Sequence, residues 1–110
     1  MTDPTVAPTI TDVSSRRRFE IEVDGATAGF VDYRRRPGVI SLIHTEIDPS
    51  HEGEGLGTLL VRAVLDRARA ERLAVLPYCP FIRHFIDRHP EYLELVPAER
   101  RAMFALDPKQ

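Results

Sequence analysis

The sequence has few of the residues that mark several protein classes. It contains one cysteine, Cys79, so an intramolecular disulfide is excluded. His84 and His89 are five residues apart rather than four, and no zinc-type spacing occurs, so we expect no metal. The formal net charge is -2 at pH 7, which gives no general attraction to nucleic acid or to an anionic membrane. No apolar stretch approaches the length of a membrane span.

The N-terminal region also lacks the basic start and apolar run of a secretory signal. We therefore expect a cytoplasmic protein, a monomer or weak homodimer, with neither nucleic acid nor membrane as a partner. The 110 residues, 43% of them hydrophobic, are enough for one domain with one core. We expect residues 1–15 to form a flexible tail and residues 16–110 to form that domain.

Apolar patterns in the first half predict strands. In residues 19–23, Phe, Ile and Val alternate with acidic residues, as in a half-buried strand. Asp24-Gly25 favours a hairpin turn into a second strand at 26–33. Residues 39–47 are apolar on both faces, so we expect a third, central strand that helices cover on both sides.

The second half predicts helices and one more strand. Residues 58–72 have apolar side chains at helical spacing and no internal Gly or Pro. The short apolar run 73–76 predicts a fourth strand, parallel to the third. Helices are expected at 80–88 and at 97–106, the latter because a proline favours the first helical position. Together these elements predict an α/β fold with a mixed sheet.

A glycine loop, EGEGLG at 52–57, lies between the third strand and the first helix. Glycine lets the backbone approach an anion, and the first turn of a helix offers unpaired N–H groups. The loop therefore favours a phosphate site, with a glycine-rich turn before an ordinary helix as the alternative. A Walker loop would need a lysine at position 57, where this chain has glycine. The Rossmann pattern would need a glycine at position 58, where this chain has threonine.

Four motifs, taken in order, resemble the GNAT superfamily of N-acetyltransferases. Residues 47–57, IDPSHEGEGLG, resemble its acetyl-CoA signature, in which an apolar residue and a proline lead into the glycine loop. HTE at 44–46, YCPF at 78–81 and HPEY at 89–92 resemble a subfamily of very short members. The resemblance implies a minimal GNAT-like acyl-CoA N-acyltransferase fold and acetyl-CoA as donor. It also implies a primary amine as acceptor, on a small molecule or a protein.

The resemblance also implies where the cofactor binds: Ile47, Glu52, Gly53, Glu54, Gly55, Leu56, Gly57, Thr58, Cys79, Pro80 and Phe81. Arg83 or Arg88 could neutralise a CoA phosphate. Glu52 stands where most members have Gln or Arg. A carboxylate about 4 Å from a phosphate charge costs about 1 kcal/mol in water, so its side chain must point away or pair with a cation.

Two usual features of the family are missing. Many members have a tyrosine that protonates the departing thiolate, where this chain has Phe85-Ile86. The helices that usually wall the acceptor site have no room before Asp24-Gly25. We therefore expect an acceptor site that is open or completed by a partner.

Glu46, His44 and Cys79 are the candidate catalytic residues. His44 and Glu46 are two apart on a strand, about 6.6 Å, so they share one face. Since an amine attacks a thioester only as the free base, we expect Glu46, and then His44, to act as base. The alternative is that Glu46 binds an arginine and His44 only packs.

Cys79 has three interpretations: a nucleophile that takes the acetyl group, a contact to the CoA sulfur, or a small buried hydrophobe. Two further functions stay open for the whole chain. One is a non-catalytic acyl-CoA-binding module, and the other is an interaction domain without a cofactor.

Overall fold

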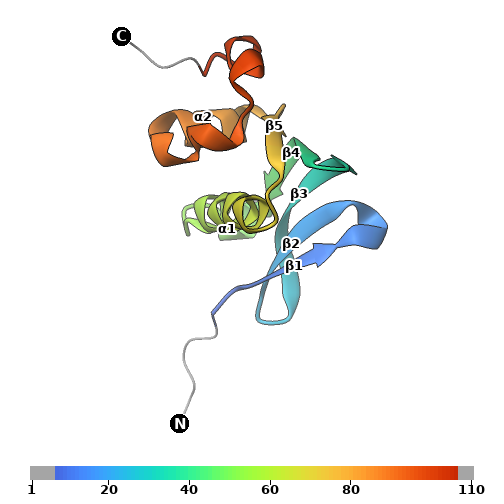
Figure 1. Ribbon diagram of the computed structural model, residues 1–110. Coiled ribbons are helices and arrows are strands. Elements are labelled where there is room, and N and C mark those ends of the chain that lie inside the picture. Colours follow the sequence, from blue (N-terminus) through green and yellow to red (C-terminus); the bar gives the residue numbers. More distant parts are fainter. Residues whose placement is uncertain (1–6, 107–110) are drawn as a thin grey trace.

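Five strands form one sheet in chain order, β1-β2-β3-β4-β5 (Figure 1). Their bounds are Thr9–Val13, Arg18–Val23, Ala26–Arg36, Val39–Ile47 and Ala74–Pro77. The first four pair antiparallel, and β5 pairs parallel to β4. The computed structural model describes residues 7–106. The predicted α/β fold with a mixed sheet is confirmed.

Local sequence explains the long β2–β3–β4 meander. Asp24 (φ 54°) and Gly25 (φ 81°) both have positive φ, as the predicted tight hairpin requires. β3 runs three residues beyond the expected 26–33, and the chain then turns at Gly38, which also has positive φ. β4 has the predicted bounds.

Both α-helices lie on the same side of the sheet (Figure 1). They are α1, Leu56–Ala70, and α2, Pro80–Arg88, the latter with its predicted bounds. On that side Val31, Leu42 and Val75 are fully buried. The expectation that helices cover β4 on both sides is wrong, because within residues 7–106 no α-helix covers the other face. Ile43 on β4 is accordingly 38% exposed.

The predicted tail overlaps a strand. Thr9–Val13 forms β1 on the edge of the sheet, paired with β2, and the turn Ser14–Arg16 joins them. The expected tail boundary at residue 15 is therefore wrong, and residues 1–6 lie outside the described residues. This edge strand was missed because its alternation is mostly polar, with none of its side chains fully buried.

The predicted helix at 97–106 is also wrong. Two short 3₁₀ turns, Ala98–Arg100 and Ala102–Phe104, replace it, after a third at Pro90–Leu95. Ala105 takes a left-handed conformation, and the Leu106 N–H donates to the Arg101 carbonyl at 2.8 Å. This reversal buries both Phe104 and Leu106, which a continuing helix would not do.

Tyr33 ties β3 to β1 and gives a pH-dependent prediction. Its hydroxyl donates to Asp12 Oδ1 at 2.5 Å, and burial together with this bond raises the pKa of Tyr33 to about 12. The neutral phenol is therefore favoured in the fold, and its stabilisation is complete below about pH 10 and is lost as the pH rises through about 12. We expect Tyr33→Phe to lower the free energy of unfolding at pH 7 by about 1–2 kcal/mol.

The variant should also lose less further stability than the wild type between about pH 10 and 12. Urea unfolding followed by circular dichroism at a series of pH values measures both effects. Tyr78→Phe, which changes an exposed hydroxyl, is the control. An unchanged alkaline slope in Tyr33→Phe would show that this hydroxyl is not linked to folding.

Candidate functional site

The loop between β4 and α1 is built by a local cap and two glycines. The Asp48 carboxylate accepts from the backbone N–H of Ser50 at 2.9 Å and from its hydroxyl at 2.8 Å. These bonds, the backbone one first, lower the pKa of Asp48. Gly53 (φ 85°) and Gly55 (φ 78°) then turn the chain into α1. Both have the left-handed backbone that other residues adopt only at a cost.

The first turn of α1 presents unpaired backbone N–H groups. Gly55 is the N-cap, and no side chain caps the helix. The Leu59 N–H donates to the Gly55 carbonyl at 3.1 Å, but within residues 7–106 the N–H groups of residues 55–58 find no such acceptor. This end of α1 is therefore a group of free donors with the positive pole of the helix behind it.

A hollow of about 240 Å³ lies against this turn. Its lining residues are Ile47, His51, Glu52, Gly53, Gly55, Leu56, Gly57, Thr58 and Phe81. Eight of the eleven residues expected to hold a cofactor are therefore together, whereas Glu54, Cys79 and Pro80 do not line the hollow. Glu52 forms no salt bridge within the described part of the chain, and its side chain is exposed.

His51 is a further residue of the site that was not predicted. Its Nδ1 lies 2.9 Å from Glu54 Oε1, so this pair joins two neighbouring turns of the loop beside the hollow. Its position inside the glycine signature was the available signal. Gly57 has a different role, because a Cβ there would lie 3.1 Å from Phe81 Cζ. A glycine at 57 thus lets the Phe81 ring close one wall of the hollow.

His44 and Glu46 lie on the face of the sheet opposite the helices. Their side chains share one face, as predicted, and His44 Nε2 is 3.1 Å from Glu46 Oε1. The centres of the His44 and Phe30 rings are 6.1 Å apart. The Arg18 guanidinium lies over the Phe30 ring, 4.3 Å from its centre. More than half of each side chain in the His44–Glu46 pair is exposed, so solvent and an incoming acceptor can reach it.

β4 and β5 separate at the level of this pair. Their pairing ends at Leu42↔Pro77, and the Cys79 N–H then donates to the Leu42 carbonyl at 3.0 Å. Residues 43–47 of β4 continue with no β5 partner. A register shift between β3 and β4 at the same level leaves one extra residue in β4. We refer to this unpaired edge of residues 43–47, beside the glycine loop, as the opening between β4 and β5.

Cys79 lies on the other side of β4 from the His44–Glu46 pair. Its thiol is buried and lies 3.4 Å from Thr45 Oγ1, a partner that the sequence analysis did not identify. Neighbouring residues of a strand point to opposite faces, so Thr45 and the Cys79 thiol lie on one face of β4, and His44 and Glu46 lie on the other.

The His-Pro-Glu-Tyr motif packs α2 against α1. The His89 ring stacks on Phe85 at 4.1 Å, and the Tyr92 hydroxyl donates to Asp66 Oδ1 at 2.7 Å. Burial and then the bond to Asp66 raise the pKa of Tyr92. These residues hold the helices together and do not reach the glycine loop.

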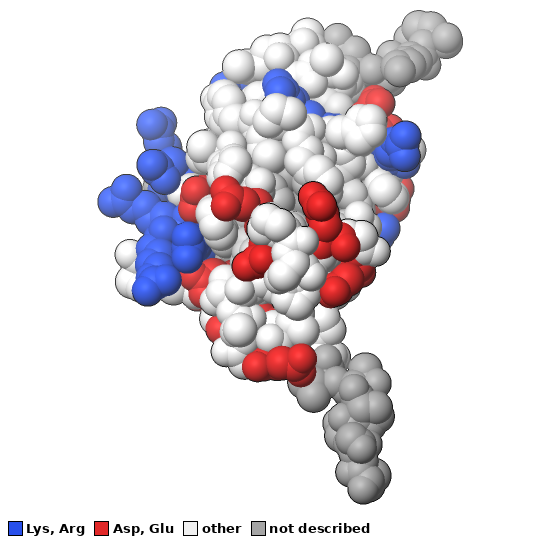
Figure 2. Space-filling view, turned by 180° about the vertical axis from the view of Figure 1, so that it is seen from behind, with Lys and Arg blue, Asp and Glu red and all other residues white. Residues whose placement is uncertain are grey.

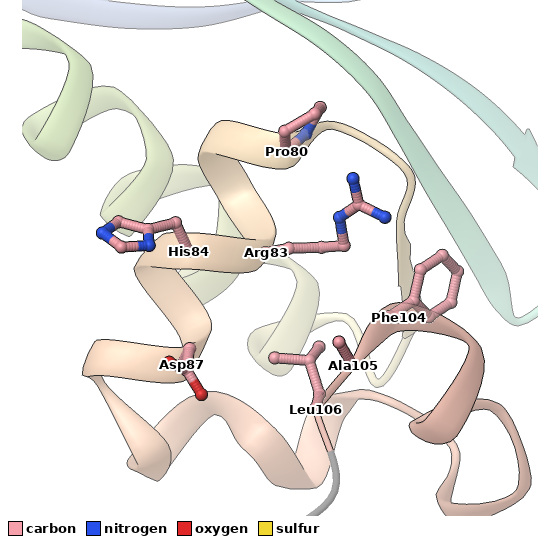
Figure 3. Close-up of a pocket in the computed structure, with 7 residues that line it drawn as sticks. All are labelled: Pro80, Arg83, His84, Asp87, Phe104, Ala105 and Leu106. Carbon is pink, nitrogen blue, oxygen red and sulfur yellow. The ribbon is translucent and has the colours of Figure 1, made fainter.

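A second hollow, of about 250 Å³, lies between α2 and the C-terminal segment. Figure 3 shows Arg83 and His84 on opposite sides of α2, with Arg83 extending toward Phe104. Arg83 and Arg88 do not line the glycine-loop hollow. Among residues 7–106 no three His, Cys, Asp or Glu side chains gather as a metal site would need, and no helix there is long and apolar enough to cross a membrane.

Comparisons with known proteins agree with this geometry. The model of a family described as GCN5-related N-acetyl-transferase matches residues 18–95. A mycothiol acetyltransferase from Segniliparus rotundus is 42% identical over 55 residues. The match covers 49% of this chain and spans only 21% of that relative's own length.

Two solved structures share the fold. The NMR structure of a GCN5-like protein from Staphylococcus aureus has a TM-score of 0.63 and 23% identity, over 81% of this chain and 87% of that one. The crystal structure of a ribosomal-protein-alanine N-acetyltransferase from Brucella melitensis has a TM-score of 0.51 and 20% identity. It covers 74% of this chain and 60% of that one. At these identities the likeness concerns the fold.

The burial of Cys79 predicts a protected thiol. Because the side chain is 3% exposed, we expect the native protein to react with a thiol reagent at least roughly 100-fold more slowly than the unfolded chain. The double variant Cys79→Ser/Ala70→Cys moves the single thiol to an exposed position at the end of α1 and should react freely. Equal rates for the two native proteins would show that Cys79 is accessible.

Proposed function

Because the chain belongs to the GCN5-related N-acetyltransferase family, we propose that it transfers an acetyl group from acetyl-CoA to a primary amine. The observation that carries this proposal is the uncapped first turn of α1, with its free N–H groups beside a glycine-lined hollow. Such a turn suits a diphosphate, since several N–H groups can bond the same anion. An interaction domain would not need these free donors.

In this proposal the chain holds acetyl-CoA at two places. The N–H groups of residues 55–58 bind the pyrophosphate, with Gly53 and Gly55 leaving room for it. The arm that carries the acetyl group lies in the opening between β4 and β5, where residues 43–47 have no β5 partner. Bound acetyl-CoA supplies a thioester carbonyl that an amine can attack.

Glu46 is the proposed base, with His44 as its neighbour. Glu46 takes a proton from the acceptor ammonium, and the free amine nitrogen forms a bond to the thioester carbon. The nitrogen loses its second proton to water, the carbon–sulfur bond breaks, and the sulfur leaves with its electron pair as the CoA thiolate. The His44 contact at 3.1 Å holds the carboxylate in place on the open face, where an acceptor can arrive.

Cys79 is proposed to contact the CoA sulfur rather than to carry the acetyl group. Its buried thiol has a threonine hydroxyl as its contact and is separated by β4 from the proposed base. A nucleophilic cysteine would need a neighbouring base or cation to form its thiolate.

The departing thiolate needs no acid in this scheme. Phe85 and Ile86, which occupy the stretch where many family members have a tyrosine, are both buried in the core. Since a thiol has a pKa near ~8.5, its thiolate is a reasonable leaving group without protonation.

Calorimetry with CoA and a Gly55→Val variant tests the loop. Valine at φ 78° is strained, so we expect the loop to change and CoA affinity to fall at least about tenfold. Gly25→Val is the matched control, because Gly25 has φ 81° and equally open surroundings but lies in the β2–β3 turn. A wild-type dissociation constant for Gly55→Val would contradict the loop assignment.

Replacing the proposed base separates an enzyme from an acyl-CoA-binding module. We expect Glu46→Gln to lower kcat by roughly 10²–10⁴ with any acceptor amine, while CoA affinity stays the same. His44→Gln should have a smaller effect, and Glu22→Gln on β2 is the control on the same sheet. Labelled acetyl-CoA and a panel of amines provide the assay. Undiminished turnover in Glu46→Gln would eliminate Glu46 as base, and CoA binding without turnover in the wild type would favour the binding module.

A further inference from the structure

The helix-free face of the sheet carries a groove that leads to the proposed base. It has a volume of about 360 Å³ and is formed by β3, β4, β5 and the C-terminal turns. Its lining residues are Arg34, Arg36, Val39, Ser41, Ile43, Leu76, Tyr78 and Arg100. Ile43 at its end directly precedes His44, so the groove and the His44–Glu46 pair adjoin on β4.

Strand alternation sends two of three consecutive arginines into this groove. Arg34 pairs with Ser41 and Arg36 with Val39, and both partners line the groove. Arg35 faces the other way and bonds Glu71 at the end of α1 at 2.8 Å. The arginine run is therefore divided between a structural ion pair and the open groove.

The charge of the groove is unmatched. Arg34, Arg36 and Arg100 line it, and no acidic residue does. Within residues 7–106 none of the three forms a salt bridge. Arg34 donates to the Tyr33 carbonyl at 3.1 Å, and Arg100 donates to the Tyr78 hydroxyl at 3.2 Å. Both guanidinium groups keep further donors for a ligand.

Basic and acidic side chains are also separated on the surface of the molecule. Figure 2 shows basic side chains gathered on the side of the molecule where the β1–β2 and β3–β4 turns lie, while acidic side chains predominate in the middle of that view. The floor of the groove contains exposed apolar side chains, Ile43 and Tyr78. Guanidinium groups beside an apolar floor suit a ligand with an anionic group on an apolar or peptide-like body.

We propose that the groove binds a carboxylate or phosphate group of the amine acceptor, so that the preferred acceptors are amines that carry an anion. This inference rests on the proposed function. Arg34 pairs with Ser41, which is three residues before His44 and five before the proposed base Glu46, or about 10 and 16 Å along the strand. The anion and the reacting nitrogen of the acceptor should therefore be roughly 10–16 Å apart, the length of about three to five extended residues.

Matched tetrapeptide amides test this spacing. Gly-Gly-Gly-Glu, Gly-Gly-Gly-Gln and Gly-Gly-Gly-Arg amides differ only in the fourth side chain, and the Glu and Gln side chains have nearly the same shape with different charge. We expect kcat/KM to be at least about tenfold higher for the Glu peptide than for the Gln peptide, since three arginines each contribute a few-fold. The Arg peptide should be the poorest, and raising the salt concentration should reduce the difference. A second series, 6-aminohexanoate against hexylamine, shows whether a small molecule gains as much as a peptide.

Variants connect the preference to the groove. We expect two variants, the double variant Arg34→Gln/Arg36→Gln and the single variant Arg100→Gln, to bring the ratio of kcat/KM for the Glu and Gln peptides toward one. In both, kcat/KM for the Gln peptide should change less than about twofold. Arg72→Gln removes the same charge from an exposed position outside the groove and should leave the ratio unchanged. Fluorescence anisotropy of labelled Glu and Gln peptides with the CoA-loaded protein measures the same preference as a difference in binding affinity, without turnover.

The outcomes separate this inference from the proposed function. Acetylation of all peptides at similar rates, or a preference that survives in the groove variants, overturns the inference and leaves the enzyme. A loss of CoA affinity in the groove variants also overturns it, because the arginines would then belong to the CoA site. No CoA binding and no acetylation by the wild type would overturn the proposed function, and equal anisotropy of the two peptides with the protein alone would then overturn the inference as well.

Discussion

The site depends on the place where β4 and β5 stop pairing. Up to Leu42 the two strands share the ladder of a parallel pair, and a last bond runs from the Cys79 N–H to the Leu42 carbonyl. Beyond that bond β4 continues for five residues toward the glycine loop, paired with β3 but with no partner on its β5 side. The proposed base, the buried thiol and the loop all take their positions from this separation. A pairing longer by a few residues would close the opening between the strands.

Local rules predicted the elements whose signals lie within a few residues. Asp24-Gly25 specified its hairpin because both positions need positive φ, and prolines or glycines set the limits of β4 and α2. The glycine loop and the shared face of His44 and Glu46 were also predictable, since each depends on spacing along one segment.

Long-range packing decided the elements that were mispredicted. β1 is held by its partner strand and by Tyr33, 21 residues from Asp12, and its own residues give only a weak alternation. The C-terminal segment forms turns because Phe104 and Leu106 reach the core from both sides of a reversal. The side of β4 that receives Cys79 follows from the register of three strands, which local spacing does not determine.

The absence of a helix over one face within residues 7–106 has an energetic consequence. Solvent reaches the His44–Glu46 pair, so these two groups interact only weakly with a charge that develops there, at a dielectric constant close to that of the solvent. An amine whose body lies along β3 and β4 would displace that water and lower the local dielectric constant as it binds. The acceptor itself would thus exclude water from the proposed base, and a bulky acceptor would exclude more water than a slender one.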